Sequence, residues 1–250
     1  MLLRSLSPET LKVFKSYLQP VDLPLRFKLG EPGRDCHWIY FPDSGVASVL
    51  GKVGTNWQEI GVFGQDGAGC LFSLLGARKM PYLIVMQVPG AGVRAPAAAV
   101  AELFQEREEV RTVFLRYVVA FMIQTAQSAI ANVQYNTVQR MAHWFLMIHD
   151  RVDGDSILLT HEYIARMLGV GRTGVTLALH ALEEAGTIST ARKRITILDR
   201  ARLETMTASV YGVAEAEYRR LIGSVPLSHS ALHGPPGPNG ATAPRQGQIT

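Results

Sequence analysis

The side chains best suited to bind a partner lie between positions 160 and 186, in the segment THEYIARMLGVGRTGVTLALHALEEAG. Most of them are the kinds of side chain that contact base edges and phosphates in duplex DNA. An arginine can bind both acceptors of a guanine, and threonine or leucine can pack on a thymine methyl group. The candidates in this segment are Thr160, His161, Arg172, Thr173, Thr176, Leu177 and His180.

The apolar residues around these candidates predict two short helices joined by a tight turn. Thr160 is a typical helix cap, Gly169-Val170-Gly171 forms the turn, and Gly186 ends a second helix that runs from about Arg172 to Ala185. The inward faces would carry Ile164, Ala165, Leu168, Val175, Ala178, Leu179 and Leu182. This is the pattern of a helix-turn-helix, whose second helix enters the DNA major groove. A plain helical core without DNA contact is the alternative.

Two β-rich runs follow directly and flank a basic tip of Arg192, Lys193 and Arg194. Such a cluster is usually a solvated turn. Next to a helix-turn-helix, we interpret it as a wing that contacts DNA phosphates and gains from counterion release. The net charge of +4 and the pI of about 9.2 permit a nucleic-acid partner but do not require one.

The two cysteines, Cys36 and Cys70, exclude a disulfide framework, a Cys₄ zinc site and a cysteine-ligated iron–sulfur cluster within one chain. Two free thiols suit a reducing cytoplasm. The start of the chain does not read as a signal peptide, and the most apolar run, Tyr82–Val88, is far shorter than the roughly 20 residues that span a bilayer. We therefore expect a soluble, cytoplasmic protein without a membrane partner.

The sequence pattern changes along the chain from helical to strand-like and back to helical. Ser7 and Pro8 predict the start of a short helix over 6–18. From 21 to 95, short apolar runs alternate with Gly, Pro and Asp turns, one of them Pro89–Gly92, which predicts an antiparallel β-roll. The clearest strands are Trp38–Phe41, Val46–Leu50, Gln58–Val62 and Leu83–Val88.

Helices follow the strands: a short one over 96–104, a long one over 106–134 and a third over 137–151. One face of the long helix carries Val110, Phe114, Tyr117 and Phe121, spaced as in a coiled-coil seam. The simpler interpretation is a core helix that packs on the roll of its own chain. We favour a parallel homodimer, because the helix is too long for its own roll.

The order of roll, long helix and T-x-E-x-I-A-x-x-L-G-V-x-R-x-x-V-x-x-x-L-x-x-L-E-x-x-G-x-I resembles the Crp/Fnr family of bacterial transcription regulators over residues 5–200. The resemblance implies an α+β chain with an N-terminal antiparallel β-roll like cyclic-nucleotide-binding domains, a long central dimerisation helix and a C-terminal winged helix-turn-helix. The corresponding ranges are 1–104 for the sensor roll, 105–136 for the central helix and 137–205 for the DNA-binding domain. Residues 223–250, rich in Gly and Pro, are expected to be a disordered tail. Family dimers bind palindromic half-sites about one helical turn apart.

This chain departs from the family pattern at both expected sites. Familiar members read DNA with Arg, Glu and Arg where this chain has Arg172, Thr173 and Leu177, so we expect a non-standard operator. In the roll, Gly69 is kept, but Cys70 replaces the Glu that holds a cyclic nucleotide's ribose, and Tyr82, with the proline before it, replaces the Arg-Ser step for its phosphate. Arg78 or Lys79 could substitute for the lost Arg. The candidate effector residues are Gly69, Cys70, Arg78 and Tyr82, and the effector itself stays open.

Other site chemistries find little support. His37 is the only histidine before His143, which excludes a clustered-histidine metal site in the roll. A haem bound by His37 or Cys36 stays an alternative. Cys70 could be redox-responsive, but we favour an inert buried thiol. We predict no cofactor and no metal. An enzyme would need a nucleophile–base pair or a P-loop, and neither is seen. A regulatory subunit without DNA binding is disfavoured by the wing. The short turn at Asp153–Ser156 leaves RNA polymerase as an open partner.

Overall fold

The computed structural model describes residues 2–77 and 79–223. Arg78 and, apart from Gly223, the predicted tail therefore lie outside the described residues. The chain begins with a 3₁₀ turn, η1 (Leu2–Ser5), and helix α1 (Pro8–Lys15). Ser7 caps α1, and its hydroxyl accepts a hydrogen bond from the Thr10 amide at 3.3 Å. The predicted helix start is confirmed.

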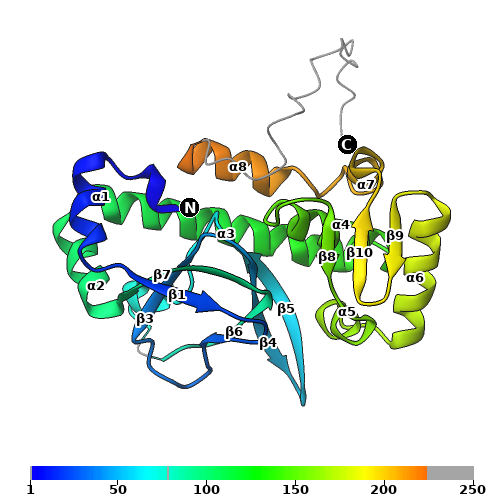
Figure 1. Ribbon diagram of the computed structural model, residues 1–250, viewed down its shortest axis with the longest axis horizontal. Coiled ribbons are helices and arrows are strands. Elements are labelled where there is room, and N and C mark those ends of the chain that lie inside the picture. Colours follow the sequence, from blue (N-terminus) through cyan, green and yellow to red (C-terminus); the bar gives the residue numbers. More distant parts are fainter. Residues whose placement is uncertain (1, 78, 224–250) are drawn as a thin grey trace, which may run out of the picture.

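Seven strands then form a roll of two antiparallel sheets (Figure 1). They are β1 (Gln19–Leu23), β2 (Lys28–Gly30), β3 (Trp38–Pro42), β4 (Val46–Val53), β5 (Asn56–Phe63), β6 (Leu83–Val88) and β7 (Gly90–Pro96). The sheet orders are β1-β7-β3 and β2-β6-β4-β5. The four strands predicted as clearest are β3 to β6. A short 3₁₀ helix, η2 (Leu71–Leu75), lies between β5 and β6.

The turn predicted at Pro89–Gly92 is wrong beyond its first residue, because β7 begins at Gly90. The glycines of this segment allow its backbone to pack closely against the backbone of neighbouring residues. A Cβ atom added at Gly90 would lie 2.2 Å from the Ser44 carbonyl oxygen, and one at Gly92 would lie 2.4 Å from the Phe41 carbonyl oxygen. Only glycine fits so near a neighbouring backbone.

Three helices follow the roll: α2 (Ala97–Glu106), α3 (Glu108–Gln134) and α4 (Thr137–His149). Asn136 and Gln139 form a capping box at the start of α4. Helix α3 runs along one side of the roll and is the longest element in Figure 1. Among the described residues, α3 is the helix that is long and apolar enough to cross a membrane. One of its faces, however, packs on the roll of its own chain.

The face of α3 predicted for dimerisation is instead part of this chain's core. Val110, Phe114 and Tyr117 are buried, and Phe121 packs against the same cluster. The ring of Phe114 lies 6.0 Å from that of Phe14 in α1, centroid to centroid. The prediction is therefore wrong for these four residues, since they already contact the roll and α1. The exposed face of α3 carries other apolar side chains, namely Leu115, Val119, Met122, Ile130 and Val133.

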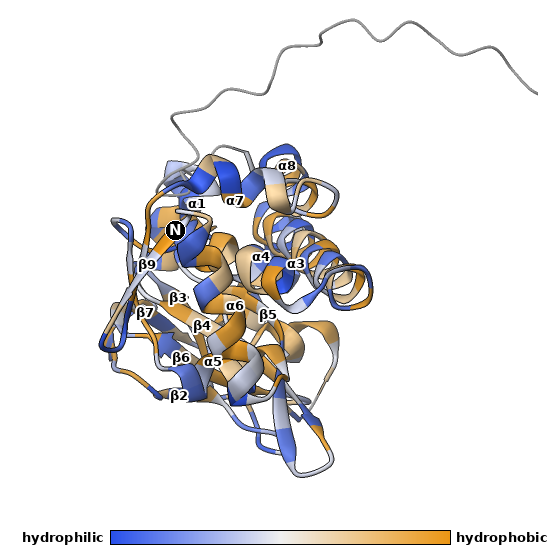
Figure 2. Ribbon diagram, turned by 90° about the vertical axis from the view of Figure 1, so that its right-hand side faces the viewer, coloured by the Kyte–Doolittle hydropathy of each residue, from blue (hydrophilic) through white to orange (hydrophobic). Residues whose placement is uncertain are grey.

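The third part of the chain is a compact domain with a small antiparallel sheet of order β8-β10-β9. Its elements are β8 (Ser156–Leu158), α5 (His161–Leu168), α6 (Arg172–Glu184), β9 (Ile188–Ala191), β10 (Arg194–Ile197) and α7 (Arg200–Met206). Its core is continuous with Trp144 and Phe145 of α4 and with Val46, Leu50 and Val62 of the roll. Figure 2 looks at the molecule from this end, with α5 and α6 in front of the strands of the roll.

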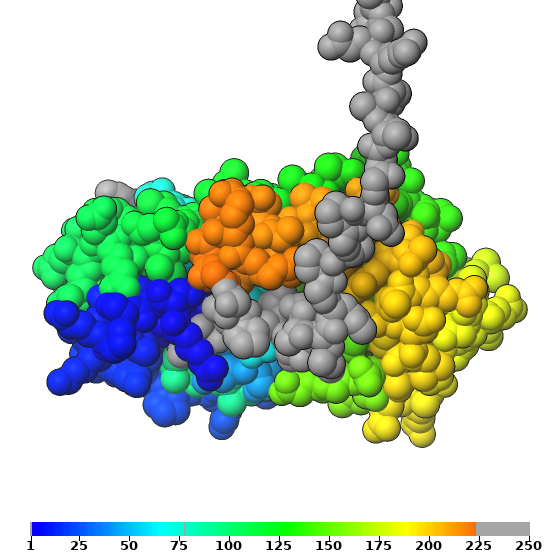
Figure 3. Space-filling model, turned by 90° about the horizontal axis from the view of Figure 1, so that it is seen from above, coloured from blue at the N-terminus to red at the C-terminus, as the bar shows by residue number. Residues whose placement is uncertain are grey.

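A last helix, α8 (Val213–Ile222), was not predicted. It leaves the compact domain and returns along α3 toward the first helices, as the orange segment of Figures 1 and 3 shows. Tyr218 of α8 donates a hydrogen bond to the Asp66 carbonyl oxygen, and Arg116 of α3 donates to the Leu221 carbonyl oxygen at 3.4 Å. Helix α8 thus fastens the end of the described chain to the roll and to α3.

Candidate nucleic-acid interface

The predicted helix-turn-helix is formed by α5 and α6. The Thr160 hydroxyl accepts a hydrogen bond from the Tyr163 amide at 3.2 Å and so caps α5. Gly169 ends α5 in the left-handed region, with φ of 64°, and α6 begins three residues later at Arg172. Gly186 also has a positive φ, of 69°, directly after α6. Local residue chemistry therefore fixes both ends of α5 and the end of α6.

The two faces of α6 divide as predicted. The inward face is buried in the domain core and consists of Val175, Ala178, Leu179 and Leu182. Arg172, Thr173, Leu177 and His180 lie on the exposed face. Leu177 is 66% exposed, which is unusual for a leucine in a domain that has a core to fill. Figure 1 shows that α6 lies at the outer end of the molecule, where a duplex could reach it.

Arg172 has the geometry of a side chain that can reach out to a partner. Its side chain is 76% exposed, and its guanidinium lies 3.7 Å from the Glu162 carboxylate of α5. Exposed ion pairs of this kind contribute little free energy, so the guanidinium can exchange Glu162 for another acceptor at small cost. Thr176 is different: its hydroxyl donates to the Arg172 carbonyl oxygen at 3.1 Å, and the residue is half-buried.

The predicted basic wing is the hairpin of β9 and β10. Arg192 and Lys193 form its turn, Arg194 begins β10, and all three are exposed. Lys193 has a left-handed backbone, with φ of 61°. The wing is tied to α6, because Glu183 accepts a hydrogen bond from the Thr190 amide at 2.7 Å. The Thr190 side chain and, to a smaller extent, this amide bond hold the pKa of Glu183 below its usual range.

The helix-turn-helix also rests on the β-roll. Trp144 of α4 donates its indole N–H to Glu59 of β5 at 2.6 Å. A Cβ atom added at Gly169 would lie 3.3 Å from the Gln58 side chain, so the turn between α5 and α6 touches β5. Arg140 of α4 donates to the Leu168 carbonyl oxygen at the end of α5. These contacts orient α5 and α6 relative to the roll.

Residues 139–206 match a family model described as a Crp-like helix-turn-helix domain. This part of the chain is therefore a Crp-like DNA-binding domain, and the protein is a DNA-binding transcription regulator. Its DNA-binding domain supports binding to DNA and regulation of transcription, as the sequence predicts. No curated protein matches the chain.

Solved structures with the same fold include several regulators. The regulator CLP of Xanthomonas campestris, described as c-di-GMP responsive, is 15% identical; the match covers 76% of this chain and 99% of that chain, with a TM-score of 0.62. A Crp-family regulator of Thermus thermophilus is 18% identical, with 76% and 97% covered and a TM-score of 0.63. FixK2 of Bradyrhizobium japonicum is 12% identical, with 76% and 96% covered and a TM-score of 0.65. At these identities the likeness shows the shared fold alone.

Two of the three described candidate effector residues of the regulator line the same cavity. Gly69 is buried in the backbone of the roll, and its amide donates to the Tyr40 carbonyl oxygen at 2.8 Å. Cys70 and Tyr82 line a cavity between the roll and α3. Arg78 lies outside the described residues, and Lys79 forms an exposed ion pair with Asp35 at 2.9 Å. The structure thus brings two of the four candidates together.

The two thiols of the regulator are neighbours. Cys70 is buried and donates to the Leu29 carbonyl oxygen at 3.1 Å, while Cys36 is half-buried and donates to the Trp38 carbonyl oxygen at 3.0 Å. The interaction between the two thiols lowers the pKa of Cys36 and raises that of Cys70. His37 is exposed beside them. Among the described residues, no three His, Cys, Asp or Glu side chains form a group that could hold a metal ion.

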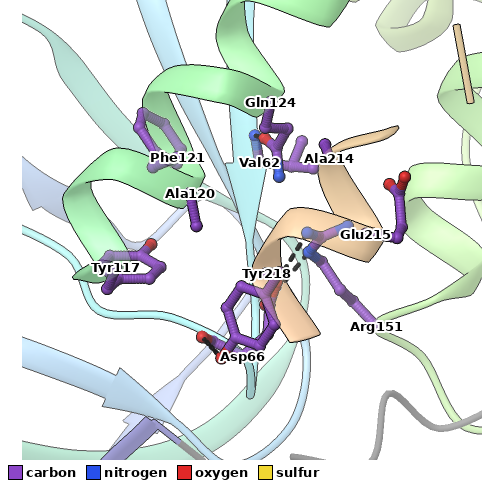
Figure 4. Close-up of a pocket in the computed structure, with 10 residues that line it drawn as sticks. All are labelled: Val62, Asp66, Tyr117, Ala120, Phe121, Gln124, Arg151, Ala214, Glu215 and Tyr218. Atoms are coloured by element: carbon purple, nitrogen blue, oxygen red, sulfur yellow. Dashed lines mark hydrogen bonds and ion pairs between the residues drawn. The ribbon is translucent and has the colours of Figure 1, made fainter. Parts of the chain in front are cut away.

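A buried ion pair joins the regulator's parts and was missed from the sequence. Arg151, just after α4, binds both carboxylate oxygens of Asp66, with Nη2 2.7 Å from Oδ2 and Nε 3.1 Å from Oδ1. Figure 4 shows this pair beneath Tyr218 and Glu215 of α8. Burial raises the pKa of Glu215, and Asp150 raises it further. The two partners are 85 positions apart, so no local pattern signals their pairing.

Proposed function

We propose that the regulator binds a palindromic DNA site as a homodimer, with α6 in the major groove and the wing on phosphates. The observation that carries this proposal is the exposed Arg172 at the amino-terminal end of α6, the part of a recognition helix that meets base edges. Arg172 would donate two hydrogen bonds to a guanine. Arg192, Lys193 and Arg194 would contact the backbone, and Thr160 and His161, exposed at the start of α5, would do the same.

The homodimer is supported by the exposed face of α3. Its apolar side chains Leu115, Val119, Met122, Ile130 and Val133 form an unpartnered stripe on a helix of 27 residues. Exposed apolar patches of this kind mark interfaces, and a two-fold axis along α3 would let two copies of this stripe pair with each other. The axis would also present two α6 helices to half-sites about 34 Å apart, or one turn of DNA.

The proposed operator differs from that of familiar family members. Thr173 and Leu177 are exposed beside Arg172, and neither can copy a charged base contact. Their methyl groups suit the C5-methyl groups of thymine. We therefore expect half-sites with one guanine read by Arg172 and neighbouring thymines. Selection of bound duplexes from a random pool tests this expectation, and recovery of the usual family half-site would contradict it.

The main experiment is a mobility shift with the selected duplex and the Arg172→Ala variant. Loss of a bidentate guanine contact should weaken sequence-specific binding by about 1–3 kcal/mol and relax preference at one base position. Arg219→Ala is the matched control, because Arg219 is an exposed arginine on α8, away from α6. Equal losses for the two variants would overturn the assignment of α6 to the groove.

We also propose that the regulator is not an enzyme and acts in the cytoplasm, both on the strength of its DNA-binding domain. In vitro transcription with purified RNA polymerase on the selected promoter would distinguish activation from repression. The turn around Gly154, between α4 and β8, is short, so we expect repression by occlusion more than activation through this turn.

A further inference from the structure

A cavity of about 510 Å³ lies between the roll and α3. Its floor is made by buried residues of the roll, among them Val49, Phe63 and Ile84, and its wall by Tyr117 and Phe121 of α3. This volume lies within the range of about 300–1,000 Å³ that is typical of small-molecule sites. The cavity is therefore large enough to hold a ligand and is not a packing defect.

The lining is almost wholly apolar. Among the described residues that line the cavity, none carries a charge, and the polar side-chain groups are the thiol of Cys70 and the hydroxyls of Tyr82, Tyr117 and Thr125. Cys70 donates to the Leu29 carbonyl oxygen at 3.1 Å, and Thr125 donates to the Phe121 carbonyl oxygen at 2.9 Å. Tyr117 is almost fully buried, and its hydroxyl lies against the backbone at Gly67, where an added Cβ atom would be 2.3 Å away.

This leaves Tyr82 as the polar group best placed to meet a ligand. Tyr82 is half-buried, and its ring lies edge-on against that of Phe72, with centroids 5.7 Å apart. A phosphate or carboxylate in such a site would lose its hydration without gaining a cation, which is costly. An apolar molecule would gain from leaving water. The described part of the lining therefore favours neutral ligands over cyclic nucleotides.

We propose that this cavity binds an uncharged, apolar small molecule with at most one hydroxyl or carbonyl group, which Tyr82 would contact. The proposal rests on the proposed function, since it assigns a chemical class to the signal that the regulator senses. The mouth of the cavity is formed by Leu75, Met122 and Ala126. Met122, 64% exposed, also belongs to the apolar stripe of α3, so a bound ligand would lie beside the proposed dimer interface.

The test is a fluorescence titration of the full chain with N-phenyl-1-naphthylamine, an uncharged apolar probe. We expect saturable binding of one probe per chain, at protein concentrations that sedimentation shows to be monomeric and at those it shows to be dimeric. Decanol should displace the probe better than decanoate, and cyclic AMP should not displace it. Because the titration contains no DNA, its failure is distinguishable from a failure of DNA binding.

Two variants locate the probe, with a matched control. Ala126→Trp places a ring at the mouth, and Val49→Phe adds a ring to the floor. Each should weaken probe binding at least about tenfold, or about 1.4 kcal/mol. Val133→Trp on the same helix is the control, because Val133 is exposed and lies outside the cavity lining; circular dichroism checks the fold of all three.

Four results would overturn the proposal. They are absence of saturable binding, equal weakening by Val133→Trp, tighter binding of decanoate than of decanol, and displacement of the probe by cyclic AMP. The second would mean that the probe binds the exposed stripe of α3, and the last two would mean that a cation serves the site. Binding to the monomer alone would show that a second copy fills the cavity on dimerisation, and it too would contradict the proposal.

Discussion

Trp144 of α4 and Glu59 of β5 are joined by a hydrogen bond of 2.6 Å between the indole Nε1 and the carboxylate Oε1. The other carboxylate oxygen accepts from the Ser48 hydroxyl, also at 2.6 Å. Burial raises the pKa of Glu59 to about 7, and the bonds from Ser48 and Trp144 oppose this rise. A single carboxyl group with an elevated pKa therefore lies where the DNA-binding domain meets the roll.

The first prediction concerns Glu59→Gln. The folded chain keeps a proton on Glu59 that the unfolded chain loses above its usual pKa of 4.5, so the stability from this group falls as pH rises from about 4.5 to 7. Glutamine keeps an acceptor for Trp144 and does not ionise. At pH 8 the free energy of unfolding of the variant, measured in urea, should therefore exceed that of the wild type by up to about 3 kcal/mol. At pH 4.5 the two free energies should be nearly equal.

His143 adds the opposite slope to the same experiment. Burial lowers its pKa to about 4, so the unfolded chain binds a proton below pH 6.5 that the folded chain refuses. Stability from His143 is lost as pH falls from 6.5 to 4. With Glu59→Gln in place, stability should rise with pH across this window. Glu102→Gln, an exposed control on α2, should leave the wild-type profile unchanged; a similar effect of both variants would contradict the prediction.

The second prediction concerns the wing. Replacing Arg192 and Lys193 by alanine should weaken binding to all duplexes alike and make the dependence of log K on log salt shallower, by about 1 for each phosphate group that the wing no longer neutralises. The base preference of the selected site should remain. Lys52→Ala is the control, because Lys52 is an exposed lysine on the hairpin of β4 and β5. A changed base preference with an unchanged salt slope would show that the wing reads bases.

The third prediction concerns the exposed face of α3. Val119→Lys places a charge in the centre of the apolar stripe and should weaken the homodimer at least about tenfold, because burying an unpaired charge is costly. Sedimentation velocity measures the change, and binding to a full palindrome should fall toward that of a half-site. Val53→Lys, at an exposed valine of β4, should leave the dimer intact. A dimer that survives Val119→Lys must use another face.

The fourth prediction concerns the pair of Asp66 and Arg151, whose side chains are both almost fully buried. Asp66→Ala leaves the guanidinium of Arg151 in the interior without its carboxylate and should cost about 3–5 kcal/mol of unfolding free energy. Asp35→Ala removes an exposed partner of Lys79 and should cost less than about 1 kcal/mol. Urea unfolding measures the free energy of both variants. Comparable losses would show that the buried ion pair of Asp66 stabilises the fold no more than an exposed one.

The helix-turn-helix was predictable because its signals are local. Thr160, Gly169 and Gly186 set helix ends through their own backbone and side-chain chemistry, and the apolar spacing between them tells the buried face of α6 from the exposed one. The dimer face of α3 could not be predicted in this way, because α3 is apolar on two sides. Spacing identified an apolar face but could not tell whether Phe114 meets the roll or a partner chain.

Other features depend on contacts between distant positions. The strand β7 was hidden because Gly90, a common turn residue, serves here to approach Ser44. The family's nucleotide-binding pattern points to Cys70 and Tyr82, but the apolar nature of their cavity depends on α3, far along the chain. The attachment of α8 depends on a contact between Tyr218 and Asp66 across 152 positions.

Helix α8 gives the DNA-binding domain a second attachment. The domain joins α3 through α4 at its beginning, and through α8 it is held again by Asp66 and Arg116 at its end. Helix α8 adds a clamp from the far side to the contacts that Trp144 and Arg151 already make with the roll. A fragment that stops at residue 206 would keep the reading surface and those contacts, but its DNA-binding domain would be held from one side only.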